Sequence, residues 1–228
     1  MEAAQVGTAP AAAPTRGLER WAALGGVAYV VLFIVGIILE VGDEPGGDAS
    51  PSTVIRWYAD SGHRDRVFVG WALIGLGLFF FLWFLSALRQ TLLRLVGDGF
   101  LTTLATVGGA IYATLALAAS AVNMGIKTMS DDTYHHQVYP DLIHAANDAG
   151  YVLHSTGGVG VGTMMIAASV AVLRARALPA WLAWIGVVAG IIALASILFF
   201  PWFVIALWLL AASIILFVAG SPRRASAL

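Results

Sequence analysis

Six apolar stretches, each about 20 residues long and so able to cross the hydrocarbon core of a bilayer, dominate this sequence. Hydrophobic residues fill 60% of the 228 positions and charged residues only 11%, whereas soluble domains hold about 45–50% and about 25%. A water-soluble fold of this length could not hide so much apolar surface, so lipid must cover part of it. We therefore predict an all-α membrane protein with six transmembrane helices. They are expected at about 21–41, 67–88, 100–123, 150–173, 178–200 and 202–220.

The arginines predict the orientation of these helices. Eight basic residues would lie on one side of the predicted bundle: Arg16, Arg20, Arg89, Arg94, Arg174, Arg176, Arg223 and Arg224. Only Arg56, Arg64, Arg66 and Lys127 would lie on the other. The positive-inside rule then puts both termini in the cytoplasm and makes three helical hairpins. The strong preference for arginine, with the richness in Ala and Gly, suggests a GC-rich bacterium, and hence its plasma (inner) membrane.

The domain organisation follows from these spans. Residues 21–220 are predicted to form one transmembrane domain. Residues 1–20, rich in Ala and Pro at their start, are expected to be a disordered cytoplasmic tail, and 221–228 a second cytoplasmic tail. The first span could instead be a cleaved signal peptide, but it is longer than a signal core and no Ala-x-Ala site follows it.

Several function classes are excluded or disfavoured by what the chain lacks. The net charge of −1 leaves no basic surface for nucleic acid, and the absence of cysteine excludes thiolate ligands and a cysteine nucleophile. No Asp, Glu, Lys or Arg lies near the middle of a predicted span, which disfavours an ion-coupled transporter. The small polar residues within the spans are too ordinary to define a pathway: Thr114, Ser120, Asn123 and Ser196. A passive or small-molecule carrier remains open.

Small residues within the spans predict close helix packing. The run GGVGVG at 157–162 and the pair Gly186 and Gly190 place glycines four residues apart, as helix interfaces in membranes often do. The run follows no strand and precedes no Lys-Ser or Lys-Thr pair, so it is not a phosphate loop. Residue identity shows no convincing internal repeat.

The first long loop, at 42–66, is predicted to hold a short amphipathic helix on the membrane surface. Ser50 can cap its start and Pro51 suits its first turn. Apolar residues then follow at helical spacing, which gives the helix one face for the membrane.

The second long loop gathers titratable side chains in the stretch SDDTYHHQVYPDLIHAAND, at 130–148. Pro140 is expected to begin the helix of the fourth span, which puts two acids and a histidine on one helical face and a further histidine about a turn inside the boundary. Carboxylates and imidazoles can bind zinc or another transition metal. The candidate ligands are Asp141, His144, Asp148 and His154. The favoured alternative needs no metal, because a helix start attracts acids through its dipole. A proton-sensitive surface is a third possibility.

Two segments carry a resemblance to known proteins. LPAWLAWIGVVAG at 178–190 and FLWFLSALRQTL at 81–92 resemble segments of uncharacterised bacterial, especially actinobacterial, membrane proteins grouped as a domain of unknown function. The similarity covers most of 21–218 and is topological and compositional. It implies a six-span integral membrane fold and no catalytic residues.

The function favoured by the sequence is a polytopic membrane protein without evident catalytic machinery: a partner subunit, a sensor or a small carrier. Its expected partners are the lipid bilayer and either another membrane protein or a second copy of itself; no cofactor is predicted. The alternative is a metal-binding membrane protein or an outer-face metal-dependent hydrolase built on the His/Asp cluster at 131–154. In that enzyme Ser155 or a metal-bound water would attack, with histidine as base. Haem binding is less favoured, because haem would need two histidines at facing depths and no other predicted span contains a histidine.

Overall fold

The computed structural model describes residues 16–199 and 201–219 of the chain. Within these ranges the chain is helical, with short connecting turns and no strand. Six helices are long and apolar enough to cross a membrane. The predicted all-helical chain with six such helices is thereby confirmed. Residues 1–15 and 221–228 of the predicted tails lie outside the described residues, and the first helix begins at Arg16, within the segment predicted as a tail.

The helices follow one another along the chain with the bounds α1 Arg16–Ala23, α2 Gly25–Val41, α3 Pro51–Ala59, α4 Ser61–Val96, α5 Phe100–Lys127, α6 Pro140–Ala175, α7 Ala180–Leu194 and α8 Trp202–Ala219. Three single 3-10 turns complete the described structure, at Thr128–Ser130, Asp132–Tyr134 and Ala195–Ile197. Only Leu24 separates α1 from α2, and the two together make the first candidate span.

Helix α3 begins as its sequence predicts. The Ser50 side chain accepts a hydrogen bond from the backbone N–H of Thr53, and Pro51 occupies the first turn. Its apolar face does not point to lipid, however. Val54 and Tyr58 are buried in a small core with Ile143 of α6. The face predicted to lie on the membrane is covered by protein, because α6 extends far enough to meet it.

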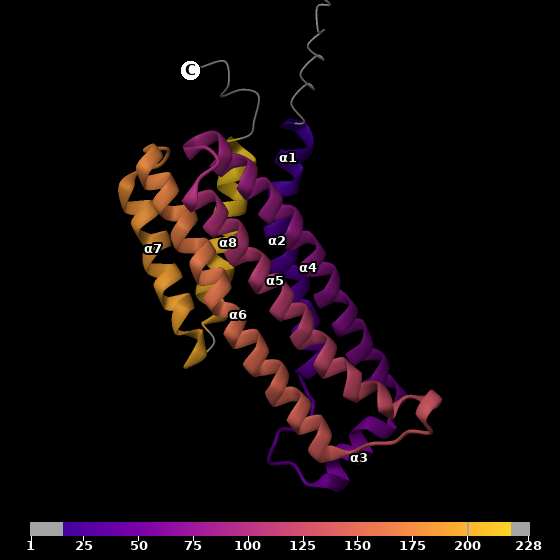
Figure 1. Ribbon diagram of the computed structural model, residues 1–228. Coiled ribbons are helices and arrows are strands. Elements are labelled where there is room, and N and C mark those ends of the chain that lie inside the picture. The colour runs from indigo at the N-terminus through magenta and orange to yellow at the C-terminus, as the bar shows by residue number, and fades with distance from the viewer. Residues whose placement is uncertain (1–15, 200, 220–228) are drawn as a thin grey trace, which may run out of the picture.

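The helices differ greatly in length, and this difference shapes the bundle. Helices α4 and α6 each have 36 residues, which corresponds to about 54 Å, well beyond the hydrocarbon thickness of about 30 Å. Figure 1 shows α4, α5 and α6 running on to the end that carries α3, while α7 and α8 stop partway. We call this end the α3 end and the opposite one, where α1 begins, the α1 end.

Helices α2 and α4 pack together in the same way as α5 and α6. A Cβ added to Gly25 of α2 would meet the carbonyl oxygen of Phe80 in α4. A Cβ added to Gly108 of α5 would lie 2.6 Å from the carbonyl oxygen of Gly160 in α6. Both first helices run from the α1 end to the α3 end (Figure 1). In both pairs, the two helix backbones therefore approach each other closely at the same level along the bundle.

The same correspondence continues one turn further along. Tyr29 covers Gly77 in the first pair and Tyr112 covers Gly157 in the second, each with its Cδ2 atom 3.4 Å from the position of an added Cβ. Both tyrosines are fully buried, and their hydroxyl groups share a hydrogen bond. The two pairs are thus an internal repeat in packing, with this bond between equivalent residues.

A third correspondence lies closer to the α3 end. Eleven residues after each tyrosine stand Glu40 in α2 and Asn123 in α5. Glu40 lies against Gly70 of α4, and Asn123 lies against Gly150 of α6. The repeat therefore places a carboxylate and an amide at matching positions.

Candidate functional site

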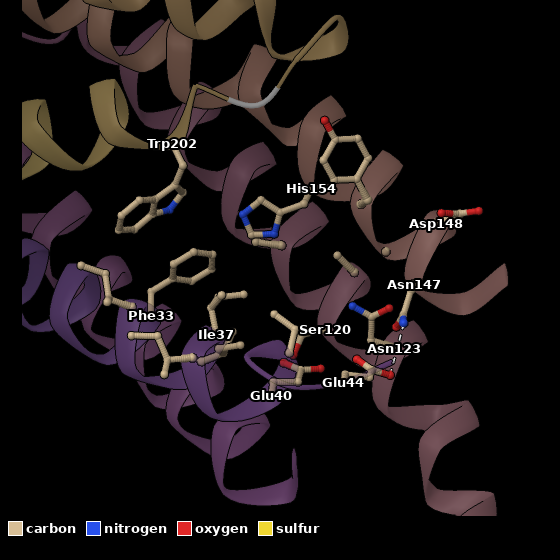
Figure 2. A pocket seen from close by; sticks show the side chains of 18 of the residues that line it. Phe33, Ile37, Glu40, Glu44, Ser120, Asn123, Asn147, Asp148, His154 and Trp202 are labelled. Atoms are coloured by element: carbon tan, nitrogen blue, oxygen red, sulfur yellow. Dashed lines mark hydrogen bonds between the residues drawn. The ribbon is translucent and has the colours of Figure 1, made fainter. Parts of the chain in front are cut away.

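A cavity of about 780 Å³ opens at the level where α7 and α8 stop and the long helices continue. Helix α2 lines one flank and α6 the other, the start of α8 closes it towards the α1 end, and α5 contributes residues between the flanks (Figure 2). Its volume lies in the range of pockets that hold small organic ligands, about 300–1,000 Å³. The repeat positions of Glu40 and Asn123 both face it.

The part of the cavity nearer the α1 end is apolar. Phe33 of α2 stacks on Trp202 of α8, with ring centroids 5.1 Å apart and planes 15° apart. Ile34 and Ile37 extend this wall, and Phe203, which is 81% exposed, stands at the rim. Phe203 belongs to α8, a helix long and apolar enough to cross a membrane, so its exposed ring is suited to contact with acyl chains. Lipid acyl chains can therefore contact the surface that borders the cavity.

The part nearer the α3 end is polar and holds buried oxygens without hydrogen-bond partners. Glu40, which is only 3% exposed, has no hydrogen bond to its Oε1 atom. The Oγ of Ser120 and the Oδ1 of Asn123 also lack partners. All three residues line the cavity, as Figure 2 shows. Buried acceptors are rarely left unmatched in native proteins, so this end is suited to a ligand that donates hydrogen bonds.

The Glu40 carboxylate belongs to a buried charge cluster. Lys127, the only lysine of the chain, lies with its Nζ atom 3.0 Å from Oε2 of Glu44 and 3.7 Å from Oε1 of Glu40. Their side chains are 1%, 6% and 4% exposed respectively. The shorter contact is a charge-assisted hydrogen bond and the longer one is an ion pair only. One ammonium group thus faces two carboxylates.

Glu44 has further partners that fix its position. Its Oε1 atom accepts a hydrogen bond of 2.6 Å from the Tyr58 hydroxyl and one of 3.3 Å from the amide of Asn147. Burial, and then the nearby Glu44 charge, raises the pKa of Tyr58 well above its usual range. Tyr58 therefore remains a donor at any physiological pH. Through this bond α3 holds the loop that covers one side of the cavity.

Replacing Tyr58 with Phe tests this attachment. The Tyr58→Phe variant should lose about 2 kcal/mol of stability at pH 7, because a donor to a buried carboxylate is removed. Since the folded-state pKa is raised, the advantage of the wild type is full below the unfolded-state pKa near 10 and declines as the pH rises beyond it. Unfolding in mixed micelles with increasing sodium dodecyl sulfate, repeated from pH 7 to 11, measures both effects. An advantage that grows above pH 10 would contradict the assignment.

His154 lies between the two parts of the cavity and connects it to the bundle interior. Its Nε2 atom is 3.4 Å from the Tyr112 hydroxyl, and its ring centroid is 5.3 Å from that of Phe33. Tyr112 in turn shares the hydrogen bond with Tyr29. A row of polar groups thus leads from the cavity to the bond between the two repeats.

The structure brings three of the four residues predicted as metal ligands to the wall of one cavity. His144, Asp148 and His154 line the cavity, whereas Asp141 is exposed and does not. Over 16–199 and 201–219, no three His, Asp or Glu side chains form a group that could hold a metal ion. The predicted zinc site therefore gains no support from this arrangement and stays a prediction. Ser155, the nucleophile of the hydrolase hypothesis, is buried in α6.

Two further histidines, His63 in the first turn of α4 and His136 in the loop before α6, make structural contacts. His63 donates from Nδ1 to the Trp57 carbonyl at 2.9 Å and stacks on the Trp57 ring, with centroids 4.4 Å apart. His136 lies 3.1 Å from the Ser130 carbonyl and 3.3 Å from Asp132. These bonds close the turns at the α3 end and explain part of the polar stretch at 130–148.

The cavity includes residues that the sequence reasoning did not single out as a site, chiefly Glu40, Ser120 and Asn123. The available signal was the position of Glu40 and Lys127 at the ends of apolar stretches, where a buried pair can form. Comparison with known proteins finds no family model, curated protein or solved structure that matches this chain.

Proposed function

We propose that this protein is a multi-pass membrane protein that binds an amphiphile in the cavity and acts as a small carrier or a sensor for it. The polar group of the ligand lies at Glu40, Ser120 and Asn123, and its hydrocarbon part lies along Phe33 and Trp202. The observation that carries this proposal is the polarity of the cavity, which changes from apolar to polar along the helices.

The direction of that change fits a membrane ligand. Phe33 and Glu40 are seven residues apart on α2, which is about 10 Å along the helix. Towards the α1 end the cavity is at the depth of α7 and α8, whereas towards the α3 end only the long helices and loops remain (Figure 1). A bound amphiphile would thus have the orientation that it has in the bilayer, with its hydrocarbon part towards the α1 end and its polar group towards the α3 end. The apolar rim at Ile38 and Phe203 suits entry from the lipid.

The internal repeat supports the carrier version. Many transporters are built from two repeats with the substrate site between them. In this chain Glu40 comes from the first repeat and Asn123 from the second, and both line the cavity. Movement of one repeat against the other would change access to the ligand.

For the orientation, we propose three hairpins with both termini in the cytoplasm of a bacterium and the α3 end outside the plasma membrane. The excess of arginine near the α1 end favours this orientation. At the α3 end, Arg64, Arg66 and Lys127 are paired with acids. The resemblance of 178–190 to actinobacterial membrane proteins agrees with this location and stays a prediction.

Photolabelling of the full-length protein in lipid nanodiscs tests the proposed function. The probe is dodecanol with a diazirine in its chain, and unlabelled dodecanol is the competitor. We expect saturable labelling of α2 and of the segment around Trp202. Ile37→Trp should reduce it at least about fivefold, because the larger ring fills the apolar part of the cavity. Val188→Trp is the matched control, because Val188 is exposed on α7 and does not line the cavity.

The outcome depends on whether the competitor reduces the labelling and on whether the two variants differ in it. Labelling that no competitor reduces, or that Ile37→Trp and Val188→Trp leave equally strong, would contradict binding in the cavity. Both variants are checked for an unchanged gel-filtration profile and helix content, so that misfolding is not mistaken for lost binding.

A further inference from the structure

We infer that the polar group of the amphiphile is a primary ammonium, so the ligand is a long-chain or otherwise apolar amine in its protonated form. This inference rests on the proposed function and specifies its substrate class. It is drawn from the charges that line the cavity and from the bonding of each carboxylate.

The charges around the cavity are acidic. Glu40, Glu44 and Asp148 line it, and neither Lys nor Arg does so among the residues that the structure describes. Lys127 stands beside the two glutamates without lining the cavity. When both carboxylates are ionised, the single ammonium of Lys127 leaves one negative charge uncompensated. An uncompensated buried charge is costly, so the cluster has a place for a second cation.

The bonding shows where that cation belongs. Glu44 receives hydrogen bonds from Lys127, Tyr58 and Asn147. Glu40 is as deeply buried, yet its Oε1 atom receives no hydrogen bond. The open position is therefore on Glu40, and this carboxylate faces the cavity.

The neighbouring groups match the shape of an ammonium. A primary ammonium donates three hydrogen bonds and accepts none. Glu40, Ser120 and Asn123 each have a buried oxygen that receives no hydrogen bond, and all three residues line the same part of the cavity. Beyond them the wall becomes apolar at Ile37 and Phe33, where the hydrocarbon part of an amine would lie.

Other head groups fit less well. A carboxylate or a phosphate would meet acids in the cavity, and like charges at an interface are strongly unfavourable. A hydroxyl group supplies a single donor and leaves the negative charge uncompensated. Because charge-assisted hydrogen bonds are roughly twice as strong as neutral ones, we expect the amine to bind at least about tenfold more tightly than the alcohol.

Three probes with the same C12 chain and the same diazirine test this inference: dodecylamine, dodecanol and dodecanoate. Dissociation constants come from saturable labelling of the full-length protein in nanodiscs at pH 7, corrected for the partition of each probe into empty nanodiscs. We expect the order amine, alcohol, carboxylate. Glu40→Gln should abolish the preference for the amine over the alcohol. Asp43→Asn is the matched control, because it removes an exposed carboxylate that pairs with Arg66.

The outcomes separate this inference from the proposed function. Equal binding of amine and alcohol by the wild-type protein would overturn the ammonium assignment while the cavity still binds amphiphiles. A preference that persists in Glu40→Gln would overturn it as well. Failure of all three probes to bind saturably would overturn the proposed function and this inference with it. Should Glu40→Gln fail to fold, the order of the three probes on the wild-type protein still decides the question.

Discussion

Replacing Lys127 with Met should destabilise the protein by about 3–5 kcal/mol, the largest effect that we expect from a single substitution. The lysine lies between Glu40 and Glu44 and is almost completely buried. Met has a similar length and no charge, so the substitution removes the cation and leaves two buried carboxylates near each other. Removing one partner of a buried pair costs more than the pair itself contributes, because the remaining charge stays desolvated.

The triple variant Lys127→Met, Glu40→Gln, Glu44→Gln separates charge from packing. It removes the carboxylates together with the ammonium, so we expect it to recover most of the stability lost by the single variant. Unfolding in mixed micelles with increasing sodium dodecyl sulfate measures both proteins. A single variant as stable as the wild type would show that the cluster is solvated, and a triple variant no more stable than the single one would assign the loss to packing.

The six helices that are long and apolar enough to cross a membrane could be predicted from the sequence, because their signal is local. Twenty apolar residues are costly in water wherever they fold, so length and composition are enough. The signal for the start of α3 was equally local. Ser50 caps the helix and Pro51, the next residue, occupies its first turn, and the structure confirms both. Its burial against Ile143 could not be foreseen, because it depends on how far α6 extends.

The charge cluster could not be predicted in this way. Glu40 and Lys127 lie at the ends of different helices, α2 and α5, and meet only after the bundle has formed. In the sequence each looks like an ordinary boundary charge. Ser120 and Asn123 are uninformative for the same reason, since small polar residues occur in many membrane helices. Their meaning comes from their shared position on the cavity wall.

The internal repeat could be predicted from the sequence only in part. The segments GGVAYVVL at 25–32 and GGAIYATL at 108–115 share two glycines, a tyrosine and a leucine at the same spacing. Four identities in eight residues are too few to establish a repeat among apolar sequences. The contacts establish it, because the glycines and tyrosines make the same approach to α4 and to α6.

Substituting Gly108 or Gly160 with Ala should separate the two helices of the second repeat and cost about 1–3 kcal/mol each. A Cβ at Gly108 would lie 2.6 Å from the carbonyl oxygen of Gly160 and 2.9 Å from the backbone nitrogen of Met164. A Cβ at Gly160 would lie 2.6 Å from the carbonyl oxygen of Gly108. These are backbone atoms, which no side-chain rotation can move away, so the helices themselves must shift.

The matched control for this prediction is Gly125→Ala, which lies on the same helix, α5, and has open space around its Cβ position. Alanine favours a helix over glycine by about 1 kcal/mol in water, so this variant should be as stable as the wild type or more so. Unfolding in mixed micelles compares the three variants. Because Gly108 and Gly160 touch each other, the double variant should not lose the sum of the single effects: once the helices have separated for one methyl group, the second finds room. Additive losses would mean that the two glycines act at independent contacts, and unchanged stability in both single variants would contradict the close approach of α5 and α6 on which the repeat depends.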